Sequence, residues 1–180
     1  MPIKSRFDAP QARFEVERMA FVALGSNLED SRAHVLAAMN RLQDLTDLPI
    51  LRSSLWNSTP VDCPPGSPMF VNAVAGLVPR RDETPESLLA RLQAIEREFG
   101  RQPKQIPNEP RPLDLDLVSF RQEVRATSEL TLPHPRADGR RFVLQPLSEI
   151  APDLVLPGGI LNVKQLIETL ETDERLSRLP

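Results

Sequence analysis

The sequence predicts an α+β fold in which helices pack on a mainly antiparallel sheet. Short apolar runs typical of strands follow one another at hairpin-like spacing, and amphipathic helical patterns lie between pairs of them. This arrangement favours the α+β class over a doubly wound parallel sheet. A chain of 180 residues with no internal repeat or visible linker also fits one domain with a substantial core.

Periodicity predicts the elements of the first half. An apolar run predicts a buried strand over residues 19–25, which ends in a Gly-Ser-Asn turn. An apolar stripe at helical spacing predicts a helix over residues 29–44. Further apolar runs predict strands over residues 50–58 and 70–78, separated by a proline-rich loop over residues 59–68. The stripe of the helix consists of Val35, Leu36, Met39, Leu42 and Leu45.

The clearest helix begins after Thr84, which is a favourable N-cap residue. Pro85 then occupies the first helical position, where its missing N–H costs nothing. Gly100 ends the helix. The apolar face consists of Leu88, Leu92, Ile95 and Phe99.

The second half begins with a loop over residues 101–112, because this stretch holds four prolines and few apolar residues. A strand is expected over residues 113–119, with a short hairpin partner near residues 122–132. A last helix is expected over residues 163–172.

Residues 1–18 show no clean periodicity. We expect an N-terminal extension that is disordered or loosely packed, with Met19 as an alternative start. The single domain is then expected over residues 19–180.

Composition excludes several classes of protein. A net charge of −3 argues against nucleic acid as the main partner, because binding a phosphate backbone needs a concentrated basic surface. The basic residues cluster instead around residues 97–111 and 136–141, where a small anion could be held. Cys63 is the single cysteine, so no intramolecular disulfide is expected. No apolar run has the length of a membrane helix and no signal-like segment is present, so we expect a cytoplasmic protein.

The strand at residues 113–119 carries the most informative pattern. Its leucines alternate with Asp114 and Asp116, whose side chains should share one face, about 6.6 Å apart along the backbone. Two carboxylates this close repel each other unless a cation lies between them, and magnesium suits such ligands. A solvated strand face is the alternative for an isolated Asp-x-Asp. The presence of Arg101, Arg111 and a later Thr-Leu-Pro-His segment favours the metal site.

Six short strings occur in the order and spacing of one known family. They lie at residues 21–28, 58–60, 70–73, 110–118, 132–136 and 140–147. Together they resemble the 6-hydroxymethyl-7,8-dihydropterin pyrophosphokinases of folate biosynthesis, over residues 19 to about 157. The resemblance implies a ferredoxin-like α+β sandwich and transfer of pyrophosphate from ATP to the hydroxymethyl group of the pterin, with release of AMP.

The resemblance also implies roles for individual residues, with ATP and a reduced pterin as substrates, two Mg²⁺ ions and a monomeric enzyme. The implied catalytic residues are Arg101, Arg111, Asp114 and Asp116, and the two aspartates are the implied metal ligands. The implied ATP-binding residues are Arg101, Arg111, Leu117, Thr131, His134 and Arg140. The implied pterin-binding residues are Thr59, Pro60, Phe70, Asn72, Asp114 and Phe142.

Four positions depart from the family pattern. Asn108 replaces a tryptophan of the mobile loop, and Pro103 replaces an arginine of that loop. Glu129 replaces an arginine on the ATP side, and Pro112 replaces a threonine. These differences leave the mechanics of the loop open.

Two other classes of function remain open at this stage. A non-catalytic pterin or nucleotide sensor would keep the pterin-binding residues but would not need the retained aspartates. A ferredoxin-like nucleic-acid module would show aromatic and basic residues interleaved on its strands, which the acidic strand contradicts.

Overall fold

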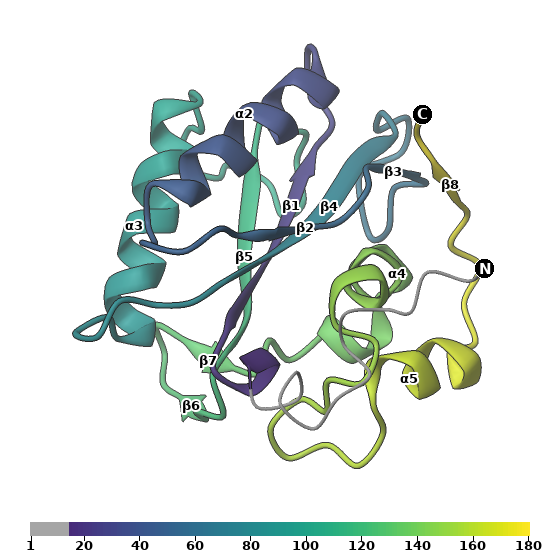
Figure 1. The fold of residues 1–180 in the computed structure, drawn as a ribbon. Helices are drawn as coiled ribbons and strands as arrows, with labels where there is room; N and C mark the ends of the chain where they lie inside the picture. Colours follow the sequence, from purple (N-terminus) through teal and green to yellow (C-terminus); the bar gives the residue numbers. More distant parts are fainter. Residues whose placement is uncertain (1–14) are drawn as a thin grey trace.

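The computed structural model describes residues 15–180 (Figure 1), and the prediction for residues 1–14 lies outside them. Residues 15–17 are helical, and Val16 packs into an apolar core with 8% of its surface exposed. Among the described residues, no helix combines the length and the apolar composition that crossing a bilayer requires.

A six-stranded sheet forms the centre of the molecule, and all of its paired strands are antiparallel. Its strands are β1 (Ala20–Ser26), β2 (Leu51–Arg52), β3 (Trp56–Ser58), β4 (Phe70–Leu77), β5 (Asp114–Phe120) and β8 (Leu176–Arg178). The order is β5-β1-β4-β3-β8, and β2 also pairs with β4. With a helix after β1 and another after β4, this order is the ferredoxin-like arrangement. The predicted fold class is confirmed.

Four α-helices cover the two faces of the sheet in the described part of the chain. They are α2 (Ser31–Gln43), α3 (Pro85–Glu98), α4 (Arg141–Ile150) and α5 (Val163–Thr169), and a short 3-10 turn, η1 (Ala137–Gly139), precedes α4. Apolar residues of α2 and α3 share one core with one face of the sheet. Residues of α4 and α5 form a second core on the opposite face, as the positions of the helices in Figure 1 show.

The start and end of α3 agree with the sequence prediction. The Thr84 side chain accepts a hydrogen bond from Ser87 N at 3.1 Å, and the Ser87 side chain accepts one from Thr84 N at 2.9 Å. This reciprocal capping satisfies two N–H groups that the helix leaves free. Gly100 has a φ of 85°, a left-handed conformation that glycine adopts without strain and that ends the helix.

Two strand predictions are wrong in detail. The single strand expected over residues 50–58 is interrupted, because the Ser53 hydroxyl accepts the hydrogen bond of Val74 N at 2.8 Å in place of a backbone carbonyl. Residues 122–132, expected to form a strand paired with β5, instead form a small hairpin of their own. Its strands are β6 (Arg125–Ala126) and β7 (Thr131–Leu132). Arg121 directs the chain away from β5 with a φ of 52°.

The helices also correct the sequence analysis. Leu36 is 43% exposed and does not belong to the apolar stripe of α2. The last helix ends at Thr169, three residues earlier than expected. Helix α4 and strand β8 were not predicted. Pro146 inside α4 hid its helical pattern. In β8 only one of the three side chains is partly buried, so the strand has no apolar alternation to detect.

Candidate active site

Strand β5 presents both aspartates on one face, as its alternating pattern predicts. Leu115 and Leu117 of this strand, and Leu113 just before it, are buried in the core under α2 and α3. Asp114 and Asp116 therefore face the side of the sheet that carries α4, where their side chains are 19% and 37% exposed. They are close enough to interact and open enough to meet a ligand.

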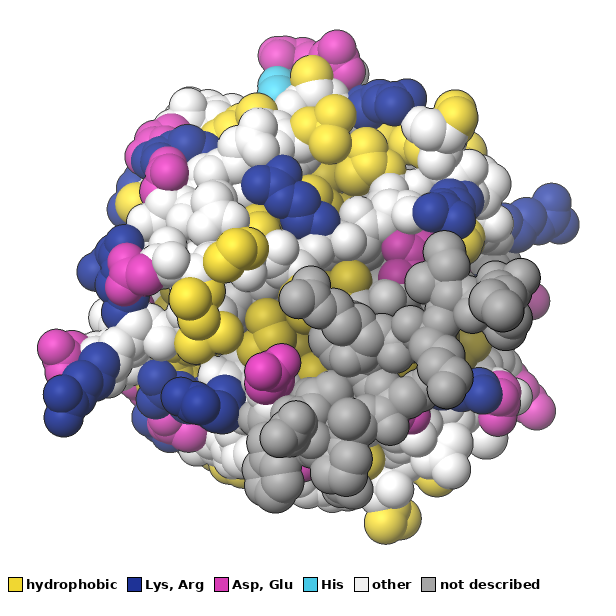
Figure 2. Space-filling model, in the orientation of Figure 1, with side chains coloured by type: hydrophobic (Ala, Val, Ile, Leu, Met, Phe, Trp, Pro, Cys, Tyr) yellow, Lys and Arg dark blue, Asp and Glu magenta, His cyan; other side chains and the backbone are white. Residues whose placement is uncertain are grey.

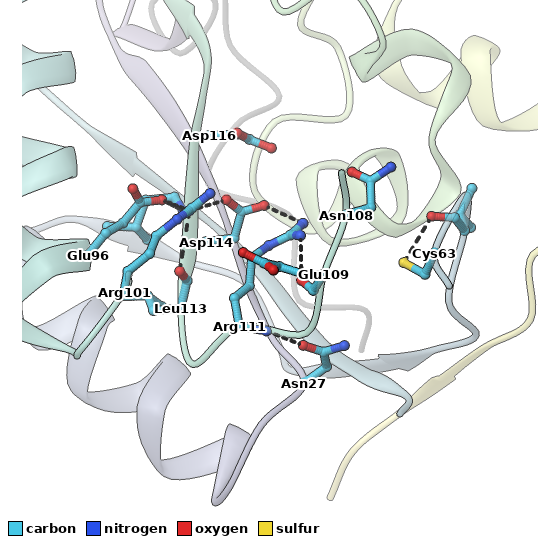
Figure 3. A network of polar contacts seen from close by, with 12 residues as sticks. Asn27, Cys63, Glu96, Arg101, Asn108, Glu109, Arg111, Leu113, Asp114 and Asp116 are labelled. Atoms are coloured by element: carbon cyan, nitrogen blue, oxygen red, sulfur yellow. Dashed lines mark hydrogen bonds and ion pairs between the residues drawn. The ribbon is translucent and has the colours of Figure 1, made fainter. Parts of the chain in front are cut away.

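Two arginines bind the carboxylate of Asp114 (Figure 3). Arg111 Nη2 lies 2.9 Å from Asp114 Oδ2, and Arg101 Nη1 donates to the other oxygen, Oδ1. Burial alone would raise the pKa of Asp114, but the charges of Arg111 and Arg101 outweigh it and hold the pKa below its ordinary value. Asp114 is thus an ionised carboxylate with both oxygens paired.

Asp116 has weaker partners. Its Oδ2 lies 3.9 Å from both His134 Nε2 and Arg140 Nη1. Burial, and then the negative charge of Asp114, raise the pKa of Asp116 to about 6. Burial and the nearby arginines, Arg140 first, lower the pKa of His134 to about 4, so this imidazole is neutral at pH 7. Asp116 therefore has less positive charge close to it than Asp114 has.

The donor set of this pair fits magnesium. Within residues 15–180, no histidine, cysteine or further carboxylate joins the two aspartates as a third ligand of a closed metal cage. Mg²⁺ commonly binds one or two protein carboxylates and completes its shell with water and substrate phosphates. A cation beside Asp116 would also relieve the repulsion that raises its pKa.

Glu96 is a site residue that the sequence analysis missed. Its Oε1 accepts hydrogen bonds from Arg101 Nη1 and, at 2.7 Å, from Leu115 N. The residue is 8% exposed, and burial raises its pKa to about 7. A charged residue at a core-facing position of α3, between Leu92 and Phe99, was the available signal. Glu96 connects α3, β5 and Arg101.

Asn27, expected only as a turn residue, holds the main chain of Arg111. Its Oδ1 accepts from Arg111 N at 2.9 Å, and its own N–H donates to Arg111 O at 3.3 Å. Asn27 is 3% exposed. The turn after β1 therefore fixes the base of the arginine that binds Asp114, as Figure 3 shows.

An aromatic cavity opens beside the carboxylates. Its lining includes Gly25, Thr59, Phe70, Asn72 and Phe142. Asn72 is 3% exposed, and its Nδ2 donates to the Ser58 hydroxyl at 2.6 Å. A Cβ at Gly25 would lie 3.4 Å from Asn72 Oδ1, so glycine keeps the amide oxygen accessible. The cavity offers two rings and one oriented amide.

A cationic cavity lies on the other side of the aspartates. Its lining includes Arg101, Lys104, Arg111, His134, Arg136 and Arg140. Five residues line both cavities: Asn108, Arg111, Asp114, Asp116 and Arg140. Guanidinium groups also lie over the aromatic rings, Arg111 at 5.6 Å from Phe70 and Arg140 at 5.3 Å from Phe142.

Three residues of the predicted site lie outside these linings. Pro60 follows Thr59 but does not line the aromatic cavity, and Thr131 is exposed on β7. The side chain of Leu117 is 3% exposed in the core, so only its main chain, on the outer edge of β5, is left for a ligand. The structure brings the other predicted site residues together at the two cavities.

Asn108 connects two loops at the entrance of the aromatic cavity. Its Nδ2 donates to Asp62 O at 2.8 Å, which joins loop 101–112 to loop 59–68. Its φ of 55° is a left-handed conformation that asparagine tolerates better than most residues. A bulky tryptophan in the same conformation would be strained.

Fold and site together define an α+β domain with paired carboxylates inside a cluster of cations. The model of one protein family, 7,8-dihydro-6-hydroxymethylpterin-pyrophosphokinase (HPPK), matches residues 21–152. The chain belongs to this family of transferases.

Two bacterial relatives are each named 2-amino-4-hydroxy-6-hydroxymethyldihydropteridine pyrophosphokinase. The protein of Pseudomonas aeruginosa is 41% identical over 140 residues, which cover 77% of this chain and 84% of that protein. The protein of Haemophilus influenzae is 40% identical over 141 residues, which cover 78% and 86%.

Solved structures share the fold at low sequence identity. A structure described as HPPK-DHPS in complex with substrates matches with a TM-score of 0.63 and 12% identity, over 84% of this chain. A Plasmodium falciparum HPPK-DHPS matches with a TM-score of 0.64, also at 12% identity, over 83% of this chain. This chain spans 42% of each of those chains.

Proposed function

We propose that this chain transfers pyrophosphate from ATP to the hydroxymethyl group of 6-hydroxymethyl-7,8-dihydropterin and releases AMP. One observation carries the proposal: Asp114 and Asp116 lie between a cavity lined by cations and a cavity lined by aromatic rings. The first suits the phosphates of a nucleotide, and the second suits a flat heterocycle. The family membership of the chain supports the same reaction.

The reaction places its charge on phosphate oxygens. The pterin hydroxyl oxygen attacks the β-phosphorus, and the bond between this phosphorus and the α–β bridging oxygen breaks. The hydroxyl proton is released, and AMP leaves with the bridging oxygen. Such transfers depend on positioning and charge neutralisation. Arg101, Arg111 and Arg140 supply forked donors for this task, and neutral His134 supplies a further hydrogen bond.

Asp114 and Asp116 would hold two Mg²⁺ ions that arrive with ATP. When bound, the ions neutralise phosphate charge. Asp114 must then exchange at least part of its pairing with Arg101 and Arg111 for the metal. The same exchange would free the two guanidinium groups for phosphate oxygens, so that metal and arginines act on one substrate.

The pterin would occupy the aromatic cavity. Phe70 and Phe142 provide apolar ring surfaces, and Asn72 provides an amide oriented by Ser58. A pterin edge carries several donors and acceptors, which must be paired when the ring is buried. Asp114 and Asp116 line the same cavity, so the hydroxymethyl group would point towards them.

We further propose that the enzyme is a cytoplasmic monomer with small-molecule substrates and no nucleic-acid or membrane partner. The distribution of charge supports the absence of a nucleic-acid partner. On the face shown in Figure 2, the described Lys and Arg side chains are interspersed with Asp and Glu side chains. A surface of this kind is a poor match for a nucleic-acid backbone.

A direct assay tests the reaction. Purified protein is incubated with hydroxymethyldihydropterin, ATP and Mg²⁺, and the products are separated by chromatography and identified by phosphorus NMR. We expect AMP and a pterin diphosphate in equal amounts, and neither product when Mg²⁺ or the pterin is omitted. Formation of ADP and a pterin monophosphate would contradict the proposal.

A further inference from the structure

The C-terminal tail, residues 171–180, lies outside the segment that matches the family. Two neighbouring residues of this tail nevertheless bind residues that line the aromatic cavity. Its strand β8 pairs with β3 at the edge of the sheet, with Leu176 opposite Ser58. The pairing extends to Thr59, whose N–H donates to Arg175 O at 3.2 Å. Arg175 N in turn donates to the Thr59 hydroxyl at 3.3 Å. Thr59 is therefore held by the main chain of the tail.

Glu174, the preceding residue, binds a second element that lines the cavity. The N-cap position of α4 is Arg140, whose side chain makes no capping hydrogen bond. The Glu174 carboxylate provides the missing acceptor, because its Oε2 accepts from Phe142 N at 3.0 Å. A carboxylate at the start of a helix also interacts favourably with the helix dipole. Glu174 thus fixes the turn of α4 that carries Phe142.

Thr59 and Phe142 both line the aromatic cavity, and the residues that hold them are adjacent in the chain. One dipeptide therefore contacts two residues of the cavity lining. The same edge of the sheet also supports Asn72, because Ser58 of β3 accepts the hydrogen bond of its amide. Neither Glu174 nor Arg175 lines the cationic cavity.

We propose that Glu174 and the main chain of Arg175 are positioning residues that hold Thr59 and Phe142 at the separation required by the pterin. They act on pterin affinity more than on ATP affinity, because Glu174 influences the cationic cavity only through its charge near Arg140. This inference rests on the proposed function, because it assigns the aromatic cavity to the pterin.

Three single variants test the role of Glu174. Glu174→Ala removes the acceptor, Glu174→Gln keeps an acceptor oxygen without the charge, and Asp173→Ala removes an exposed neighbouring carboxylate as a control. For Glu174→Ala we expect the KM and the calorimetric Kd for the pterin to rise about three- to tenfold, the effect of losing a helix cap. The KM for ATP should change by less than about twofold. Glu174→Gln should recover most of the loss, and Asp173→Ala should match the wild type.

The outcomes separate this inference from the proposed function. An unchanged pterin Kd in Glu174→Ala, or equal losses for pterin and ATP, would overturn the positioning role while an active wild type still supports the reaction. An inactive wild type that binds pterin would overturn the reaction alone, since the calorimetric comparison of variants still decides the positioning role. A wild type that does not bind pterin would overturn both. Thermal unfolding of each variant separates a local change at the cavity from a loss of folded protein.

Discussion

At the scale of single residues, Asp114 and Asp116 have the same chemistry but opposite surroundings. Asp114 is paired with two arginines, and its pKa is held below the ordinary value because their charges outweigh the effect of burial. The pKa of Asp116 is raised to about 6 by burial and by the charge of Asp114. The first carboxylate stabilises the folded chain before any ligand arrives, whereas the second is kept at a cost in stability.

This difference predicts that activity and stability separate in two variants. Asp114→Asn and Asp116→Asn should each reduce turnover by at least about 100-fold, because each removes a charged ligand of the proposed magnesium site. Asp114→Asn should also lower the free energy of unfolding by about 1–3 kcal/mol, since it removes the carboxylate paired with Arg111 and one of the two paired with Arg101. Asp116→Asn should leave stability unchanged or increased.

Denaturant unfolding of the metal-free variants measures the stability difference, and the AMP assay measures turnover. Asp138→Asn, an exposed aspartate of η1, is the matched control for both. Equal destabilisation by the two site variants would show that the pairing of Asp114 is not what distinguishes them.

Glu96 gives a prediction for pH. Its pKa rises from 4.5 in the unfolded chain to about 7 in the folded protein, because it is buried. Between these values the folded state binds a proton that the unfolded state lacks, so the contribution of Glu96 to stability is greatest at low pH and falls as pH rises to about 7. The loss attributable to this group is at most about 3 kcal/mol.

Glu96→Gln should remove this part of the pH dependence, because the amide does not titrate and its oxygen can still accept from Leu115 N. The measurement is the free energy of unfolding between pH 4.5 and 7.5, as wild type minus variant, with Glu168→Gln on the exposed side of α5 as the control. If wild type and variant have parallel pH profiles, Glu96 does not titrate in this range.

At the scale of elements, the sequence predicted the features that depend on residues adjacent in the chain. The alternation of β5, the capped start of α3 and the proline-rich loop 101–112 are local patterns, and the structure confirms them. The family strings also located Phe70, Asn72 and Phe142. Contacts between distant segments left no such pattern. Three hydrogen bonds form only in the folded chain: those of Glu96 with Leu115, of Asn27 with Arg111 and of Glu174 with Phe142. Helix α4 was missed for another reason, because the proline inside it hid its helical pattern.

The contact between the two loops gives an element-scale prediction. Asn108→Gly keeps the left-handed conformation but loses the hydrogen bond to Asp62 O, so the KM for the pterin should rise about three- to tenfold. Asn108→Ala should have the same defect and an additional destabilisation of about 1 kcal/mol, because its Cβ disfavours a positive φ. Steady-state kinetics and thermal unfolding measure the two effects. Gln102→Ala, in an exposed part of the same loop, is the control. Wild-type kinetics in Asn108→Gly would show that the contact with Asp62 does not contribute to pterin binding.

At the scale of the whole molecule, the two faces of the sheet have different tasks. The core under α2 and α3 fixes β1, β4 and β5, and the opposite face carries the aspartates, the cavities and α4. Segments far apart in the sequence meet at this second face: the turn after β1, β3 with the tail, β4, loop 101–112, β5 and the start of α4. A ligand that contacts several of them should therefore stabilise the whole domain and order its least supported segment.

Loop 101–112 is that segment. Its two ends are fixed, because Arg101 and Arg111 both bind Asp114, while the residues between them are largely exposed. We expect hydrogen exchange over residues 102–110 to be fast in the free protein. It should slow at least about tenfold when Mg²⁺ and a non-hydrolysable ATP analogue are both present, since phosphates then engage the arginines at its ends. Mass spectrometry of peptides from this loop measures the change, and peptides from α3 serve as the internal control. Because the metal must compete with the arginines for Asp114, the analogue alone should slow exchange less than the analogue with Mg²⁺. Exchange that is equally slow with and without ligands would contradict a loop that closes on the nucleotide.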